Sequence, residues 1–338
     1  MNKNDSAYNV NFVESIIENN LSNSWFKMRK YRTGTFTQHG QDSIVLLKLL
    51  HDYCSDYNLK VTVIHFDHNW RPDSKINAEL IGYLAIHFHF SYYCFSYSKK
   101  NYSEEAARRW RYKLSLRIAK QLHYTSILTA HTLTDRLETL LYNLFRGSGL
   151  DGLACIAPIL FGNKDICLIR PLRNIDRSNI YYLCRKLLLP IWTDYTNFDI
   201  ARARNKIRSE LIPYVMSSFN PSLYQELSSF LSIVTNDIEY LQLKTCFFYR
   251  LILHPHRCAL NKTALKQLHP CLQKRLLKLF LSKNNCYDIS VLHMNRILID
   301  TAIYPELIFI NKKYSIYVSK NWVYIMKNIN KTQFEYQL

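Results

Sequence analysis

The fold is decided by Gln38-His39-Gly40-Gln41-Asp42-Ser43, which runs on into the apolar stretch Ile44-Val45-Leu46-Leu47. This turn follows a predicted strand at 33–38 and starts a predicted helix over 42–54, with an acid and a hydroxyl group in its first turn. The free N–H groups and the positive end of the helix dipole suit a phosphate. An ordinary strand-to-helix turn with an N-cap explains the same residues. No Gly-Lys-Ser/Thr follows, so the turn is not a Walker loop.

Short β-branched runs alternate with helical stretches on the C-terminal side of this turn. Further strands are predicted at 60–66 (KVTVIHF) and 125–130 (TSILTA), and further helices at 73–90 and 104–122. An alternation of this kind is typical of a parallel sheet with helices on both faces. The fold class expected for this part is therefore α/β.

The pattern changes after about Leu211. Ile212-Pro213 and Asn220-Pro221 interrupt it, and long helical windows follow at 222–252 and 262–282. The stretch from Leu307 alternates like two strands that turn at 311–313. We therefore expect a smaller, mainly helical second domain with a C-terminal β-hairpin. The expected boundaries are 1–32 for an N-terminal extension, 33–215 for the α/β domain and 216–338 for the helical domain.

The composition limits which classes of protein and of binding partner can be expected. With 48% hydrophobic and 21% charged residues, the chain can bury real cores. Its 44 Lys and Arg against 26 Asp and Glu give a formal charge of +18, which favours a polyanion such as nucleic acid. The excess is larger in 201–338, which holds 19 basic and 8 acidic residues, as expected of a module that contacts phosphates.

Other features concern the compartment. No run of 18 uncharged apolar residues occurs, so no membrane span is expected, and the polar start lacks the apolar stretch of a signal peptide. The nine cysteines form no CxxC pair, which favours a reduced compartment without a zinc or iron–sulfur framework. Tyr, Phe, Lys, Asn and Ile, whose codons are AT-rich, are abundant, as in an organelle genome. An AT-rich bacterial genome would produce the same bias.

Polar residues follow the strongest predicted strand in His65-Phe66-Asp67-His68-Asn69-Trp70-Arg71. The carboxyl ends of strands face the ligand crevice in open α/β sheets. A metal site needs more ligands than this segment offers. Hydrogen bonding to a nucleotide or a partner is the favoured interpretation.

The predicted helix at 104–122 begins with Ser103 as an N-cap and two acids in its first turn. Within 99–120 the basic side chains outnumber those acids; they are Lys99, Lys100, Arg108, Arg109, Arg111, Lys113, Arg117 and Lys120. A solvated face explains such a run as well as phosphate contacts do, but the one-sided charge favours phosphates.

A fourth segment carries the most specific pattern. His131, Asp135 and Glu138 stand at i, i+4 and i+7 and share one face of a helix that starts at about 131. An apolar stripe able to pack into a core occupies another face; it consists of Leu133, Leu137, Leu140, Leu141 and Leu144. Four of the seven glycines of the chain fall in this segment and in the turn described first; they are Gly40, Gly147, Gly149 and Gly152. Glycine is expected where the backbone turns sharply or approaches a ligand.

Taken in order, these segments resemble the tRNA(Ile)-lysidine synthetase family, a branch of the PP-loop (N-type) ATP pyrophosphatases. Gly40, Asp42 and Ser43 match the family loop Ser-Gly-Gly-x-Asp-Ser. The other matching segments are HFDHNWR (65–71), EEAARRWRY (104–112), AHTLTDRLETLLYNLFRGSGLDGL (130–153), RPL (170–172), DYTN (194–197) and RARNKIR (202–208). The resemblance is strong over about 33–221 and weak in the basic remainder.

The resemblance implies an adenine nucleotide α-hydrolase-like (PP-loop) sheet followed by a helical tRNA-binding domain. It implies a ligase that adenylates C2 of the wobble cytidine in a CAU-anticodon tRNA(Ile) and then joins L-lysine there, forming lysidine. ATP and Mg²⁺ are the implied cofactors. From the AT-biased composition we expect the plastid stroma, or otherwise a bacterial cytoplasm. A homodimer is a further expectation, which the sequence alone does not fix.

The resemblance also implies roles for single residues. The ATP phosphates would contact Gln38, His39, Gly40, Gln41, Asp42 and Ser43, with Asp42 as the Mg²⁺ contact. Arg111 would stabilise charge during adenylation, so that Asp42, Arg111 and Asp135 form the catalytic set. His131, Asp135 and Glu138 would line the pocket for cytidine and lysine. The implied tRNA contacts are Arg108, Arg202, Arg204, Lys206 and Arg208.

The chain departs from the family loop where Gln38 and His39 replace a Ser and a Gly. A Cβ at such a position can clash with phosphate. A tRNA-binding pseudoenzyme with a degenerate loop is therefore one alternative function. Another PP-loop tRNA-modifying enzyme, such as a 2-thiocytidine synthetase, is the second, although such enzymes use cysteine pairs that this chain lacks. All of these site assignments require that the turn around Gly40 and the acidic group at Asp135 open onto the same space.

Overall fold

The computed structural model describes residues 32–37, 40–54, 60–68, 73–97, 103–153, 159–163, 166–190, 203–299, 306–311 and 313–328. The chain divides into two compact units, Met1–Thr235 and Asn236–Leu338. The division falls inside helix α10 (Leu223–Ile252), whose residues belong in part to each unit. The boundaries at 32 and 215 expected from the sequence remain predictions.

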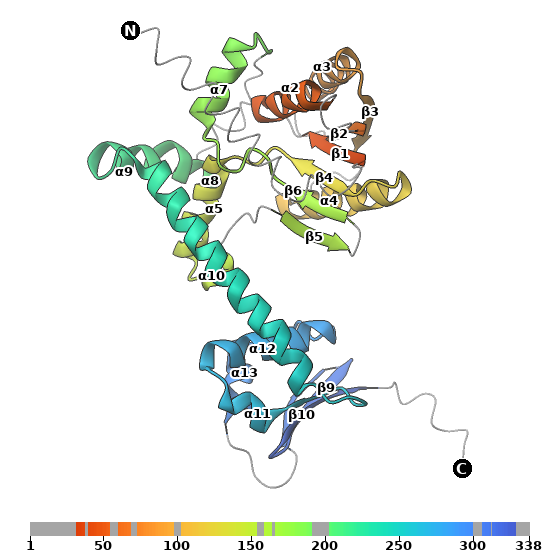
Figure 1. Ribbon diagram of the computed structural model, residues 1–338, viewed down its shortest axis with the longest axis vertical. Helices are drawn as coiled ribbons and strands as arrows, with labels where there is room; N and C mark the ends of the chain where they lie inside the picture. Colours follow the sequence, from red (N-terminus) through yellow and green to blue (C-terminus); the bar gives the residue numbers. More distant parts are fainter. Residues whose placement is uncertain are drawn as a thin grey trace. The chain divides into compact units, whose positions relative to one another are not determined.

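The first unit is built on a six-stranded sheet in the order β3-β2-β1-β4-β6-β5 (Figure 1). The strands are β1 (Arg32–Thr37), β2 (Lys60–Asp67), β3 (Ser91–Ser96), β4 (Ser126–Thr129), β5 (Ile159–Asn163) and β6 (Ile166–Ile169). Neighbouring strands are parallel except for β5, which runs antiparallel to β6. The three predicted strands and the parallel sheet are confirmed. β3, β5 and β6 were not predicted.

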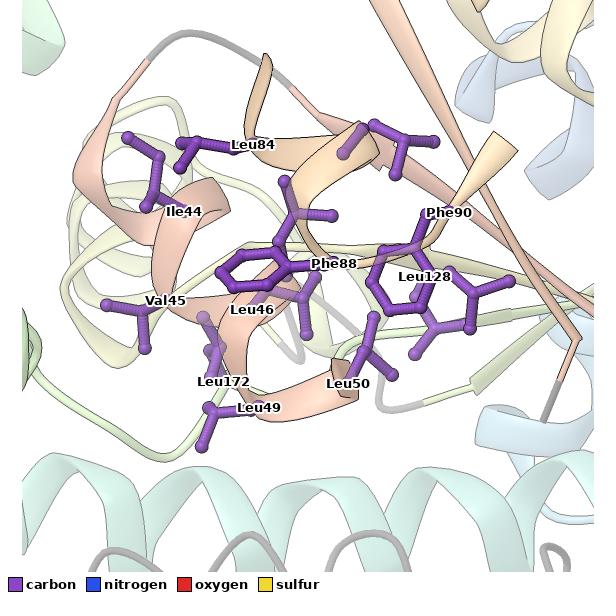
Figure 2. Packing of buried hydrophobic residues seen from close by; sticks show 14 of the residues in the cluster. Ile44, Val45, Leu46, Leu49, Leu50, Leu84, Phe88, Phe90, Leu128 and Leu172 are labelled. Carbon is purple, nitrogen blue, oxygen red and sulfur yellow. The ribbon is translucent and has the colours of Figure 1, made fainter. Parts of the chain in front are cut away.

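Helices cover both faces of this sheet because β2 buries both of its faces. Val61 and Val63 pack in one cluster with α2 (Gln41–Cys54), α3 (Ser74–His87) and α7 (Arg177–Lys186). Ile64 and Phe66, which point to the opposite face, pack in a second cluster with α4 (Glu104–Gln121). Figure 2 shows the first cluster, with Ile44, Val45, Leu46, Leu49 and Leu50 of α2 beside Leu84, Phe88, Phe90, Leu128 and Leu172.

Helix α5 (Leu133–Phe145) starts two residues later than predicted. Thr132 is its N-cap, with extended backbone, so His131 lies before the helix and the expected shared helical face of His131 with Asp135 and Glu138 is wrong. The apolar stripe is largely confirmed, since Leu133, Leu137 and Leu140 are buried, whereas Leu144 is 53% exposed. The short helix α6 (Leu150–Leu153) follows.

A continuous helical stretch forms from α8 (Ala203–Lys206), a π-helical turn η2 (Ile207–Leu211) and α9 (Ile212–Ser218). In the widened turn the Ile212 N–H donates to the carbonyl of Ile207, five residues back. Pro213 accounts for the widened turn, because proline has no N–H to donate and its ring crowds the carbonyl four residues earlier. Ile207 and Ile212 pack on Leu137 in a cluster shared with α5.

The second unit holds the C-terminal part of α10, three further helices and a four-stranded sheet. The helices are α11 (Lys262–Gln267), α12 (Pro270–Lys283) and α13 (Val291–Leu298). The strands are β7 (Ala259–Asn261), β8 (Glu306–Ile310), β9 (Tyr314–Val318) and β10 (Trp322–Lys327), in the order β7-β10-β9-β8. Their pairing is antiparallel throughout.

The predicted hairpin corresponds to β8 and β9 and is confirmed, and β10 and β7 extend it to a sheet. The helical window predicted over 262–282 holds two helices instead of one. His269 caps a new helix with Pro270 in its first turn, so α11 and α12 are separate. Among the described residues, no helix has the length and apolar character that a membrane crossing requires.

Candidate active site

The described part of the turn before α2 consists of Gly40 and the first residues of the helix. Gly40 has φ +122°, a conformation that L side chains rarely adopt, which explains the glycine. Its carbonyl accepts from the Ser43 N–H at 3.2 Å, and α2 begins at Gln41. Gln38 and His39 lie outside the described residues. The start of α2 therefore presents its first backbone N–H groups beyond the carboxyl end of β1.

Asp42 lies in the first turn of α2 with 16% of its side chain exposed. Its Oδ1 atom is buried and has no hydrogen-bond partner among the described residues. Burial raises the pKa of this carboxyl to about 6, although Arg177 acts in the opposite direction. A buried acceptor that lacks a donor suits a cation, because carboxylate oxygen is a preferred ligand of Mg²⁺.

The segment between β4 and α5 supplies the second part of the site. The Nδ1 atom of His131 lies 2.9 Å from Oγ1 of Thr129, a hydrogen-bond distance. Burial, with the positive charges of Arg170, Arg108 and Arg111, lowers the pKa of His131 to about 3, against the effect of Asp135. The imidazole is therefore neutral at physiological pH.

Asp135 and Glu138 both bind guanidinium groups. The Asp135 carboxylate accepts from the Thr132 N–H at 2.9 Å as part of a capping box, and its other oxygen lies 3.3 Å from Nη2 of Arg177. Burial would raise the pKa of Asp135, but Arg177, the Thr132 N–H and Arg208 hold it below its usual value. Arg208 donates from Nη2 to Glu138 Oε2 at 3.0 Å and lies 3.8 Å from Asp135.

One guanidinium group joins the two parts of the site. Nη2 of Arg177 lies 3.4 Å from Asp42 Oδ2 and 3.3 Å from Asp135 Oδ1. Asp42 and Asp135, 93 positions apart in the sequence, are therefore neighbours in space. The turn around Gly40 and the acidic group at Asp135 lie at the same end of the sheet.

Arg136, Arg170 and Arg173 are buried, and the charges of the first two act on the third. Arg170 is 4% exposed, and burial lowers its pKa. Burial and Arg136 together lower the pKa of Arg173 to about 9. Arg136 donates to Asn174 Oδ1 at 2.9 Å, which joins α5 to the segment after β6. A concentration of positive charge on buried side chains of this kind attracts phosphate.

The family described as the PP-loop domain matches residues 19–215 of the chain. The tRNA(Ile)-lysidine synthase, chloroplastic, of Pyropia yezoensis is 35% identical over 325 residues, which cover 95% of this chain and 96% of that protein. The chain belongs to the tRNA(Ile)-lysidine synthase family. The synthase of Nostoc sp. is 42% identical over 203 residues, which cover 60% of this chain and 59% of that protein.

A solved structure confirms the fold class. The U34-tRNA thiolase of Methanococcus maripaludis superimposes with a TM-score of 0.55 at 14% identity, over 67% of this chain and 80% of that one. At this identity the likeness concerns the fold alone. The α/β parallel sheet of PP-loop proteins, the adenine nucleotide α-hydrolase-like fold, is thus shown by sequence and by structure.

The residues expected to contact tRNA fall into separate groups. Arg204 and Lys206 are exposed on α8, and the Arg204 guanidinium lies 5.6 Å from the centre of the Tyr142 ring. Arg208 instead pairs with Glu138 inside the site. Arg108 acts on His131 through its charge and stacks on Tyr112. Arg202 lies outside the described residues.

Arg177 was not predicted from the sequence as a site residue, although it contacts both Asp42 and Asp135. Asp176 caps α7 by accepting from the Asn179 N–H at 2.9 Å, and Arg177 occupies the first helical position. A positive side chain is unfavourable next to the N-terminus of a helix. That conflict, visible in Asp176-Arg177, is the signal that acids elsewhere in the fold would have to hold the arginine.

The segment at 65–68 is buried at the end of β2. Asp67 accepts from the Ser74 hydroxyl at 3.4 Å, and His68 packs edge-on against Trp110. Asn69 to Arg71 lie outside the described residues. Within the described part of the chain, no group of three or more His, Cys, Asp and Glu side chains could hold a metal ion. Packing and hydrogen bonds hold these residues at the end of β2.

Proposed function

We propose that the chain joins L-lysine to C2 of the wobble cytidine in CAU-anticodon tRNA(Ile), converting ATP to AMP and diphosphate. Membership of the tRNA(Ile)-lysidine synthase family supports this ligase activity. The two synthases named above lend no support to a tRNA-binding pseudoenzyme or a thiolating enzyme, and the likeness to the thiolase concerns the fold alone. The reaction lets the modified anticodon pair with A instead of G.

The observation that carries the proposal is the bridge from Asp42 to Asp135 through Arg177. Lysidine formation needs an activated cytidine and a lysine amine in one place. A turn suited to phosphate and a pair of acids suited to an ammonium group adjoin one another here. Two unrelated structural ion pairs would give no reason for that proximity.

The ATP phosphates would bind at the Gly40 turn and the first N–H groups of α2. Asp42 would hold Mg²⁺, since its Oδ1 atom has no other partner among the described residues. When bound, the ion would neutralise charge on the departing diphosphate. Arg111 on α4 would add positive charge from another side of the crevice, as its effect on His131 indicates.

The lysine would bind beside Asp135 and Glu138. Asp135 stays ionised because its pKa is held low, and it can therefore receive an ammonium group. His131 is neutral and can offer a hydrogen bond to the cytidine without adding charge. Among the described residues, Arg204 and Lys206 are exposed and available to tRNA phosphates. Chloroplastic and cyanobacterial relatives favour the plastid stroma, with a bacterial cytoplasm as the alternative.

We also propose a homodimer formed through α10. Within the second unit, Tyr240, Leu243, Phe247 and Leu251 of this helix are each 58–65% exposed and recur every three to four residues. In heptad terms Tyr240 and Phe247 occupy a and Leu243 occupies d, while Glu239 and Lys244 occupy the flanking g and e positions. A second copy of the same face would cover the apolar stripe and pair the acid with the base.

The function is tested by AMP release from labelled ATP, with purified protein, L-lysine and unmodified CAU-anticodon tRNA(Ile). Release that depends on lysine is expected in the wild type, with a loss of at least about 100-fold in Asp42→Ala and in Asp135→Ala. Asp237→Ala removes an exposed acid from α10 and should match the wild type. Undiminished turnover in both site variants would refute the assignment. Binding of tRNA without AMP release would favour the pseudoenzyme.

A further inference from the structure

Arg177 serves two carboxylates with a single nitrogen. Its Nη2 atom lies 3.4 Å from Asp42 on α2 and 3.3 Å from Asp135 on α5. The three side chains are 16–29% exposed, so water screens the contacts only in part. Asp42 and Asp135 repel one another when both are ionised; Arg177, which contacts both, offsets this repulsion together with the more distant Arg208.

The backbone of Arg177 is fixed, whereas its guanidinium group is not saturated. The Arg177 N–H donates to Oγ1 of Thr134 at 3.3 Å, and Leu133 donates to the carbonyl of Ile175 at 2.9 Å, so the start of α7 is tied to the start of α5. The Nε atom of Arg177 has no hydrogen-bond partner among the described residues. The group is therefore anchored at its base and can turn towards either carboxylate.

Under the function proposed above, each of the two carboxylates has a cation to bind. Two cations would use these carboxylates in turn: Mg²⁺ accompanying ATP at Asp42, and the lysine ammonium at Asp135. When one cation takes its carboxylate, Arg177 loses that partner and can bind the other carboxylate more fully. The second cation then meets an acid that is already neutralised.

We propose that Arg177 makes the binding of Mg²⁺–ATP and the binding of lysine mutually antagonistic, so that lysine is admitted after adenylation. In the first step the C2 oxygen of the cytidine bonds to the α-phosphorus and diphosphate leaves with its Mg²⁺. Arg177 then returns to Asp42 and frees Asp135. In the second step the lysine amine, having lost a proton to water, forms the C–N bond at C2. The C–O bond breaks there, and AMP leaves with the oxygen.

The test measures the affinity for lysine by titration calorimetry, with the full chain alone and with Mg²⁺ plus the α,β-methylene analogue of ATP. The analogue cannot be cleaved, so adenylation does not follow. In the wild type, lysine is expected to bind about tenfold more weakly when the analogue is present, a typical size for coupling between sites. In Arg177→Met the two affinities should agree within about twofold. Arg185→Met removes an exposed arginine from the same helix and should keep the wild-type difference.

Arg177→Gln, neutral but still polar, repeats the measurement if the methionine variant does not fold, as judged by urea unfolding. Equal lysine affinities in the wild type, tighter binding with the analogue, or an undiminished difference in both Arg177 variants would overturn the proposal. If lysine-dependent AMP release is intact in such a case, only the antagonism fails. If the wild type binds no lysine and releases no AMP, the proposed function fails with it.

Discussion

His131 shows how burial, rather than its neighbours, decides the charge of a single residue. The pKa of about 3 in the folded chain lies below the ordinary value of 6.5. Between these values the unfolded chain binds a proton that the folded chain does not, so stability falls as the pH falls from about 6.5 towards 3. From pH 7 to pH 5 this residue should remove about 2 kcal/mol from the free energy of unfolding.

Urea unfolding at pH 7, 6 and 5 checks this prediction against His131→Asn, which cannot take up the proton. The wild type should lose about 2 kcal/mol more than the variant over this range. Parallel pH profiles for the two proteins would show that His131 is protonated in the folded state, and would remove the neutral imidazole from the proposed site.

For single residues, the sequence predicted which acids lie in the candidate site, but not which side chains those acids contact. Asp42, Asp135 and Glu138 were expected in the site, and the structure brings them together. Their counter-ions Arg177 and Arg208 come from 42 and 70 positions further along the chain than the acids Asp135 and Glu138. A spacing pattern reports neighbours within one element, so pairs of this kind are visible only after folding.

Among the elements, the start of α5 combines helix capping with the site. Thr132 is fully buried; its hydroxyl accepts from the Asp135 N–H at 3.3 Å and donates to the Asp135 carboxylate at 3.1 Å. Thr132→Ala should therefore lower the free energy of unfolding by about 1–2 kcal/mol, while Thr132→Ser, which keeps the hydroxyl, should lose less. Urea unfolding of both variants at pH 7 measures this. An alanine variant as stable as the wild type would mean that the cap contributes nothing.

The start of a helix was predicted correctly where the sequence has a clear N-cap residue. Ser103 was expected to cap α4 and does so, accepting from the Ala106 N–H at 3.2 Å. The periodic pattern at 131–144 did not distinguish the N-cap from the first helical residues, so α5 was started too early. Strand β3 escaped prediction because it is an edge strand whose residues are mostly exposed, which leaves no apolar alternation to read.

For the whole molecule, the α10 face predicts a dimer that charge at its centre should disrupt. The double variant Leu243→Glu, Phe247→Glu places like charges across the proposed contact and should be monomeric in light scattering at concentrations where the wild type is dimeric. Leu292→Glu alters a residue of α13 that is 80% exposed, and it should leave the dimer intact. A wild type that is monomeric throughout, or a double variant that still dimerises, would exclude this face as the interface.

The alternation of patterns predicted the parallel sheet and three of its strands, but neither the strand order nor β3, β5 and β6. Of the antiparallel sheet in the second unit, the sequence predicted the hairpin of β8 and β9, but not its extension by β10 and β7. Strand β7 has three residues and pairs with β10, more than 60 positions away. A pairing over so short a length and so long a separation carries no local signal.

The widened turn η2 gives the helix around Arg208 one residue more than an α-helical turn would hold. Side-chain substitutions at exposed positions such as Ser209 and Glu210 leave that count unchanged. If one of them were deleted and the turn closed to α geometry, the helix on either side would keep its facing, because the residue removed is the extra one. Ile212, only 2% exposed, would then stay against Leu137. A second deletion would rotate Ile212 away by about 100°, so the segment tolerates the loss of one residue better than the loss of two.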